Sequence, residues 1–133
     1  MYLQREIERK AFNEGGGDYT APAQLLGDFL KNTPTKKFGS VNPSCPTGVA
    51  PSDLRRILPH KVTETIAGAI QDFDNKLNGF NLYDAVLTAP ESRSSSPIRI
   101  LRNEFYQTTK VQGIFPSGEG AGYAGGIVSA AVD

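Results

Sequence analysis

Glycines gather near the end of this chain, in the pattern Gly118-Glu119-Gly120-Ala121-Gly122 followed by Gly125-Gly126. A short apolar run precedes them, and an apolar stretch of helical composition follows from Ile127. A strand, a glycine-rich turn and a helix N-terminus suit an anionic or electron-rich ligand, because glycines allow close backbone approach and first-turn N–H groups point at the ligand. The pattern therefore indicates one half of a cofactor site. A glycine-rich turn without a ligand is the alternative.

Two arginines, Arg93 and Arg99, flank the serine-rich turn Ser94–Pro97. Two guanidinium groups near a bend can hold a carboxylate or a phosphate through paired hydrogen bonds. A solvated surface loop has the same composition, so the residues alone leave both interpretations open.

The remaining candidate side chains have no visible partner in the sequence. Tyr19 follows the glycine run Gly15–Gly17 and can either stack on a ligand or pack on the core, and Gln24 can hydrogen-bond a ligand. Cys45 and His60 are single residues of their kinds and are weak candidates for catalysis. No cluster has metal-ligand spacing, so we expect no metal site.

Composition excludes several classes of function. Lys and Arg total 14, Asp and Glu total 14, and the formal net charge is zero, so we expect no nucleic-acid binding. No apolar run approaches the roughly 20 residues of a membrane span, and Met1 leads into a charged helix rather than a signal peptide. A single cysteine suits a reducing compartment, so we expect a cytoplasmic protein.

Apolar residues at helical spacing predict a helix-rich first half. In one predicted helix, Ala21–Lys31, Thr20 is the expected N-cap and Pro22 lies in the first turn. In another, Ser52 is the expected N-cap. The predicted helices are residues 3–12, 21–31, 52–58 and 59–77.

Strand composition appears after Asn81, so the expected fold class is α+β with a small sheet between Tyr83 and Ser117. The last predicted element is a helix after the glycine-rich turn. The predicted strands are residues 83–89, 98–102 and 112–117.

The segment GEGAGYAGGIVSAAVD (Gly118–Asp133) resembles the C-terminal flavin-contacting motif of bacterial NAD(FAD)-utilising dehydrogenases, large flavoproteins of the glutathione-reductase-like group. Two further stretches, AFNEGGGDYTAPAQ (Ala11–Gln24) and ESRSSSPIRI (Glu91–Ile100), fit the same family in the same order. The resemblance implies a fragment of an FAD-dependent oxidoreductase that transfers hydride through the flavin, with NAD(P)H as a possible donor. The fragment itself is expected to be inactive.

The resemblance also implies roles for individual residues. Glu119 would place its carboxylate on the ribityl hydroxyls of FAD, and a helix beginning near Ala124 to Ile127 would direct N–H groups at the flavin ring edge that becomes negative on reduction. Arg93, Arg99 and Tyr19 are the candidate substrate-binding residues. The implied cofactor-binding residues are Gly118, Glu119, Gly120, Gly122, Tyr123, Ala124, Gly125, Gly126 and Ile127.

The domain organisation follows from the same resemblance. Residues 1–112 are expected to form the inserted, substrate-side domain, and residues 113–133 the truncated return segment of the FAD-binding domain. The expected partners are the missing N-terminal FAD-binding domain of the same chain and a small-molecule substrate. The alternative function is a cofactor-free helical protein-interaction module whose glycine-rich tail is disordered.

Overall fold

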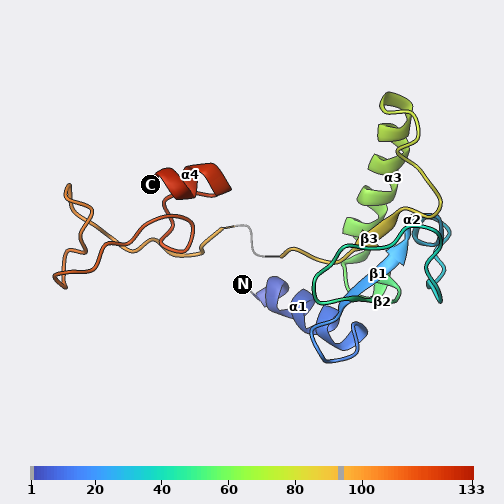
Figure 1. Ribbon diagram of the computed structural model, residues 1–133, viewed down its shortest axis with the longest axis horizontal. Helices are drawn as coiled ribbons and strands as arrows, with labels where there is room; N and C mark the ends of the chain where they lie inside the picture. The colour runs from blue at the N-terminus through green and yellow to red at the C-terminus, as the bar shows by residue number, and fades with distance from the viewer. Residues whose placement is uncertain (1, 93–94) are drawn as a thin grey trace. The chain divides into compact units, whose positions relative to one another are not determined.

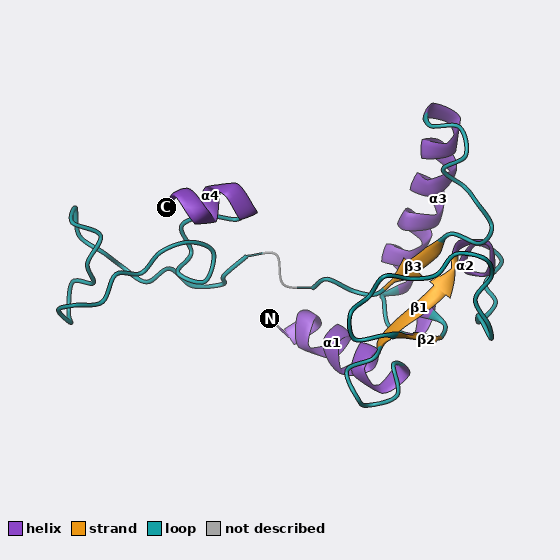
Figure 2. Ribbon diagram, viewed as in Figure 1, coloured by secondary structure: helices purple, strands orange, loops and turns teal. Residues whose placement is uncertain are grey.

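The computed structural model describes residues 2–92 and 95–133, and its fold class is α+β, as predicted (Figure 2). Two compact parts, residues 2–90 and residues 91–133, make most of their contacts within themselves. The predicted domain boundary at residue 112 concerns a longer protein and stays a prediction.

Residues 2–90 combine helices with one small mixed sheet (Figure 1). Two predicted helices, residues 3–12 and 59–77, are confirmed as α1 and α3. Within this part the elements are α1 (Tyr2–Glu14), β1 (Ala21–Leu25), α2 (Leu26–Leu30), β2 (Val49–Pro51), the 3-10 helix η1 (Leu54–Arg56), α3 (His60–Lys76) and β3 (Val86–Thr88).

The sheet has the strand order β2-β1-β3, with β2 parallel and β3 antiparallel to the central strand β1. Pro22 lies in this central strand, where a proline is uncommon because it has no N–H to donate. Its carbonyl accepts the N–H of Ala89 at 3.0 Å, but Pro22 cannot return a hydrogen bond. The antiparallel ladder therefore ends at Thr88, and Pro22, which lacks an N–H donor, lies at the end of that ladder.

One face of the sheet packs on the hydrophobic core. Because side chains alternate along a strand, Gln24 and Leu87, which are paired in register, share one face. Leu87 packs on a buried cluster drawn from both long helices and from the segments between them. The buried members of this cluster are Ala11, Leu26, Phe29, Leu54, Ile57 and Ile70.

The predicted helix over Ala21–Lys31 is wrong in its first half. Ala21–Leu25 is a strand, and helical structure begins only at Leu26. Pairing with β2 and β3 satisfies the backbone of this segment on both sides, and such long-range pairing outweighs weak local helix propensity. The predicted cap at Ser52 is also wrong, because Asp53 Oδ1 accepts the Arg55 N–H at 3.1 Å and caps η1.

The predicted strands 98–102 and 112–117 are wrong as well. The described residues 95–133 contain one isolated bridge, between Arg102 and Thr108, and the short helix α4 (Ile127–Val132). Two of the three strands of the sheet come instead from residues before 52. Apolar composition alone does not form a strand where no neighbouring strand offers a partner ladder.

Residues 95–133 hold a single buried hydrophobic residue, Ala121. Hydrogen bonds and ring contacts, rather than a core, therefore give this part its conformation. No helix in the described part of the chain is both long and apolar enough to cross a membrane. The large apolar side chains exposed in residues 95–133 are Ile98, Ile100, Leu101, Phe105, Tyr106, Val111, Ile114, Phe115, Ile127, Val128 and Val132.

Candidate functional site

The glycine-rich segment forms a closed turn from Gly118 to Tyr123. The Tyr123 N–H donates to the Gly118 carbonyl at 3.1 Å, and the Gly122 N–H donates to the Glu119 carbonyl at 3.0 Å. Gly118 and Gly122 have φ values of +65° and +82°, in the left-handed region that favours glycine. These two glycines are therefore required by the turn itself.

A neighbouring stretch, residues 98–102, holds the turn from one side. The Ile100 N–H donates to the Ala121 carbonyl at 3.1 Å. A Cβ added at Gly122 would lie 2.4 Å from the Ile98 carbonyl oxygen, so only glycine allows these two backbones to approach so closely. The Tyr123 hydroxyl donates to the Ile100 carbonyl at 3.1 Å and closes the contact.

Arg99, a predicted substrate-binding residue, lies against this turn. Its Nε donates to the Gly122 carbonyl at 3.0 Å, and its guanidinium carbon lies 4.8 Å from the centre of the Tyr123 ring. The structure thus brings Arg99 together with two of the predicted cofactor-binding residues. The other arginine of the predicted pair, Arg93, lies outside the described residues.

Two glycines of the segment have no role within the described fold. A Cβ added at Gly120 or at Gly125 would meet no atom within 4 Å, and neither residue has a positive φ. Both are exposed. Their bare backbone is therefore available to a group from outside this part of the chain.

Helix α4 begins at Ile127, directly after the glycine pair Gly125-Gly126. The Gly126 N–H donates to the Ser129 hydroxyl at 3.1 Å, and that hydroxyl donates to the Gly126 carbonyl at 3.0 Å. Ile127 is 93% exposed, while Glu119 and Ala124 are half-buried. Because α4 has only six residues, its N-terminus is a weaker feature than the bare glycine backbone beside it.

An ion pair that the sequence analysis missed ties this segment together. Arg102 donates from Nη1 to Asp133 Oδ2 at 2.9 Å and from Nη2 to Asp133 Oδ1 at 2.5 Å. The hydrogen bonds from Arg102 and from the Gly118 N–H lower the pKa of Asp133 to about 2, and the pair raises the pKa of Arg102. Thirty-one positions separate the two residues, so no local spacing signal could have found them.

Tyr19, the third predicted substrate-binding residue, belongs to the other part of the chain. Its φ is +66°, its side chain is 79% exposed, and its ring contacts Phe12 edge-on at 5.1 Å. It lines a hollow of about 310 Å³ together with Pro22 and Pro90. Gln24 is not available to a ligand, because its buried amide is hydrogen-bonded to Thr33 and Leu54.

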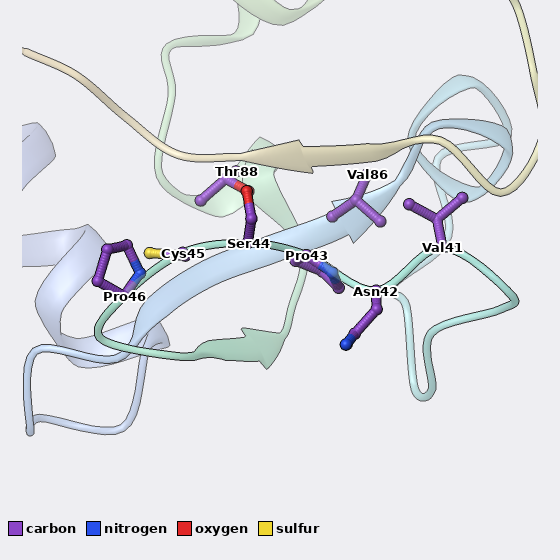
Figure 3. A pocket seen from close by; sticks show the side chains of 8 residues that line it. All are labelled: Val41, Asn42, Pro43, Ser44, Cys45, Pro46, Val86 and Thr88. Atoms are coloured by element: carbon purple, nitrogen blue, oxygen red, sulfur yellow. The ribbon is translucent and has the colours of Figure 1, made fainter.

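A second hollow, of about 510 Å³, lies on the face of the sheet that carries Val86 and Thr88 (Figure 3). The loop Val41–Pro46 forms its other wall and includes Cys45. Its lining contains no Asp, Glu, Lys, Arg or His, so it offers no charged group for acid–base chemistry or for binding an ion. His60, 87% exposed in its side chain and 3.8 Å from Glu64, lies outside both hollows.

Comparison with known proteins shows which family this chain resembles. Residues 1–94 match the family described as FAD-dependent protein, C-terminal domain-like. An uncharacterized protein of Clostridium beijerinckii (strain ATCC 51743 / NCIMB 8052) is 47% identical over 133 residues, which make up 100% of this chain and 25% of that protein. The chain thus spans a quarter of that relative's length. The family match lies before the glycine-rich turn and covers more than half of the chain. The chain belongs to the family of FAD-dependent proteins that this C-terminal domain-like region defines.

Proposed function

We propose that the full-length protein is an FAD-dependent oxidoreductase and that the segment Gly118–Ile127 contacts its flavin. The observation that supports this most directly is the bare backbone at Gly120 and Gly125, where an added Cβ would meet no atom of the described residues within 4 Å. Close approach of a cofactor requires such backbone, whereas the turn uses Gly118 and Gly122 for its own conformation. The family match independently supports FAD as the cofactor.

The residues available to hold FAD come from the turn and from the glycine pair after it. The backbone of Gly120 and Gly125 would pack against the cofactor, and the Glu119 carboxylate would accept hydrogen bonds from ribityl hydroxyls. Bound flavin supplies hydride exchange, with NAD(P)H as the proposed donor. The chain's own residues would bind the flavin, orient it and exclude water from the reacting groups.

The proposed substrate is a small molecule with an anionic group. Arg99 is exposed and is already oriented by Gly122 and Tyr123, so its guanidinium is placed beside the proposed flavin contact. An ordered guanidinium loses less side-chain entropy when it binds a carboxylate or phosphate. For Arg93 and Tyr19, substrate binding stays a proposal that rests on the sequence alone.

The proposed partner is the FAD-binding domain of the same polypeptide, in a cytoplasmic enzyme. Eleven large apolar side chains are exposed in residues 95–133, beside a single buried hydrophobic residue. Exposed apolar side chains mark an interaction site where they form a contiguous patch, and covering them is the role proposed for that domain. The matched relative is long enough to supply such a domain, since this chain spans 25% of it.

The test is flavin content in the full-length protein. We expect Gly120→Val and Gly125→Val to lower FAD affinity about five- to a hundredfold, because extra bulk at a close contact typically costs about 1–3 kcal/mol. Gly68→Val, on the open surface of α3, and Cys45→Ala are the matched controls. Flavin released by denaturation and measured by absorbance reports the result.

Two outcomes would overturn the proposal. Equal flavin content in both glycine variants and both controls would remove the glycine segment from the site. A full-length protein that does not take up FAD would favour the cofactor-free interaction module. The isolated 133-residue chain is expected to be colourless and to bind FAD no more tightly than about millimolar, because it provides only part of a flavin site.

A further inference from the structure

Arg102 is the most connected side chain in residues 95–133. Its side chain is only 10% exposed. Besides its paired hydrogen bonds to Asp133, its Nη1 donates to the Pro116 carbonyl at 2.8 Å. Its guanidinium carbon lies 3.7 Å from the centre of the Tyr123 ring and 4.8 Å from that of Tyr106. The guanidinium therefore combines planar hydrogen bonding with stacking, which a lysine cannot reproduce.

These contacts reach the glycine-rich turn at both of its ends. Pro116 lies two residues before Gly118, and Tyr123 closes the turn after Gly122. Asp133, held by Arg102, accepts the Gly118 N–H at 2.8 Å. Residues 95–133 bury only one hydrophobic residue, so the contacts of Arg102 add to the hydrogen bonds from Arg99, Ile100 and Tyr123 that hold the turn.

We infer that Arg102 is a positioning residue for the flavin-contacting segment, acting through Asp133, Pro116 and Tyr123 to present the backbone of Gly120 and Gly125. This inference rests on the proposed function. Arg102 itself does not contact the cofactor, since its guanidinium N–H groups donate to Asp133 and Pro116 and its side chain is nearly buried. A fixed glycine backbone costs less entropy on binding than one that must be ordered by the ligand.

The experiment uses the full-length protein, stripped of flavin and titrated with FAD. Arg102→Ala is expected to weaken FAD binding about ten- to a hundredfold, because FAD must then order the segment that Arg102 holds in the wild type. Arg102→Lys keeps the positive charge but lacks the planar guanidinium group. Its affinity for FAD is expected to lie between those of the wild type and Arg102→Ala. Asp133→Asn is expected to behave like Arg102→Lys. Lys110→Ala, an exposed cation in the same part, is the matched control.

A second readout separates positioning from a general loss of folding. The flavin midpoint potential and visible absorption maximum should shift in Arg102→Lys and Asp133→Asn at full FAD occupancy, because backbone dipoles near the ring move. If the wild type binds FAD while these two variants match Lys110→Ala in affinity, potential and spectrum, the inference is overturned. If the wild type does not bind FAD, the proposed function fails instead.

Discussion

Substitution of Gln24 would measure how much a single buried side-chain amide contributes to the stability of residues 2–90. Its side chain is fully buried, and its Oε1 accepts the Leu54 N–H at 2.9 Å. Its Nε2 donates to the Thr33 carbonyl at 2.8 Å. The amide therefore joins β1 to the start of η1 and to the loop after α2. Gln24→Leu removes both hydrogen bonds with little change in side-chain volume.

The expected loss of stability follows from the two backbone groups that Gln24→Leu leaves without a partner, the Leu54 N–H and the Thr33 carbonyl. The Leu54 N–H is buried, and leaving it unpaired costs about 1–3 kcal/mol. The Thr33 carbonyl belongs to an exposed residue, so water can replace its lost donor and the cost is about 1 kcal/mol. Burial of the leucine methyl groups offsets about 1 kcal/mol. We expect the free energy of unfolding to fall by about 2 kcal/mol, which lowers the urea midpoint by about 1–2 M.

Urea unfolding followed by far-ultraviolet circular dichroism measures this change, because α1 and α3 dominate the signal. The control is Gln71→Leu, an exposed glutamine in α3, which should change stability by less than about 0.5 kcal/mol. If both variants unfold at the same urea concentration, Gln24 does not hold the two segments together.

Three further predictions follow from individual contacts. A Cβ added at Gly27 would lie 1.9 Å from Tyr83 Cδ2. Gly27→Ala should therefore lower the melting temperature by about 4–8 °C or more. An equal loss in a Tyr83→Ala background would contradict this. The pKa of Asp133 is lowered from 3.8 to about 2, so the stabilisation that its ionised carboxylate provides is complete above pH 3.8 and is lost as the pH falls through about 2. A carbon-13 titration should find that midpoint in the wild type and one closer to 3.8 in Arg102→Ala; equal midpoints would disprove the pairing. Arg99→Ala should raise KM for an anionic substrate about ten- to a hundredfold, and an unchanged KM with less bound flavin would restrict Arg99 to supporting the turn.

Local periodicity was sufficient for the two long helices. The apolar stripe of residues 59–77 predicted α3 to within a residue at each end, and residues 3–12 predicted α1. Both segments bury one face and expose the other, which is the condition under which a repeat of 3.6 residues identifies a helix. The β part of the fold class was expected from strand composition after Asn81, and of the three predicted strands only residues 83–89 contain one, β3.

Strand pairing was decided by residues far apart in the chain. Ala21–Leu25 has helix-compatible composition, but its backbone pairs with residues 49–51 and 86–88. Conversely, Ile98–Arg102 has strand composition and forms only one isolated bridge. A strand depends on its partner ladder, and no window of sequence around these segments contains the partner.

The glycine pattern by itself indicated a cofactor site, and the family match agrees with the cofactor that the resemblance implied. Only the tertiary structure separated the glycines by role: Gly122 allows two backbones to meet, whereas Gly125 faces open space. The same holds for Arg102 and Asp133, which look like ordinary surface charges in the sequence. Residue type and spacing report local conformation, but which atoms occupy the space beside a backbone is fixed by segments that meet only when the chain folds.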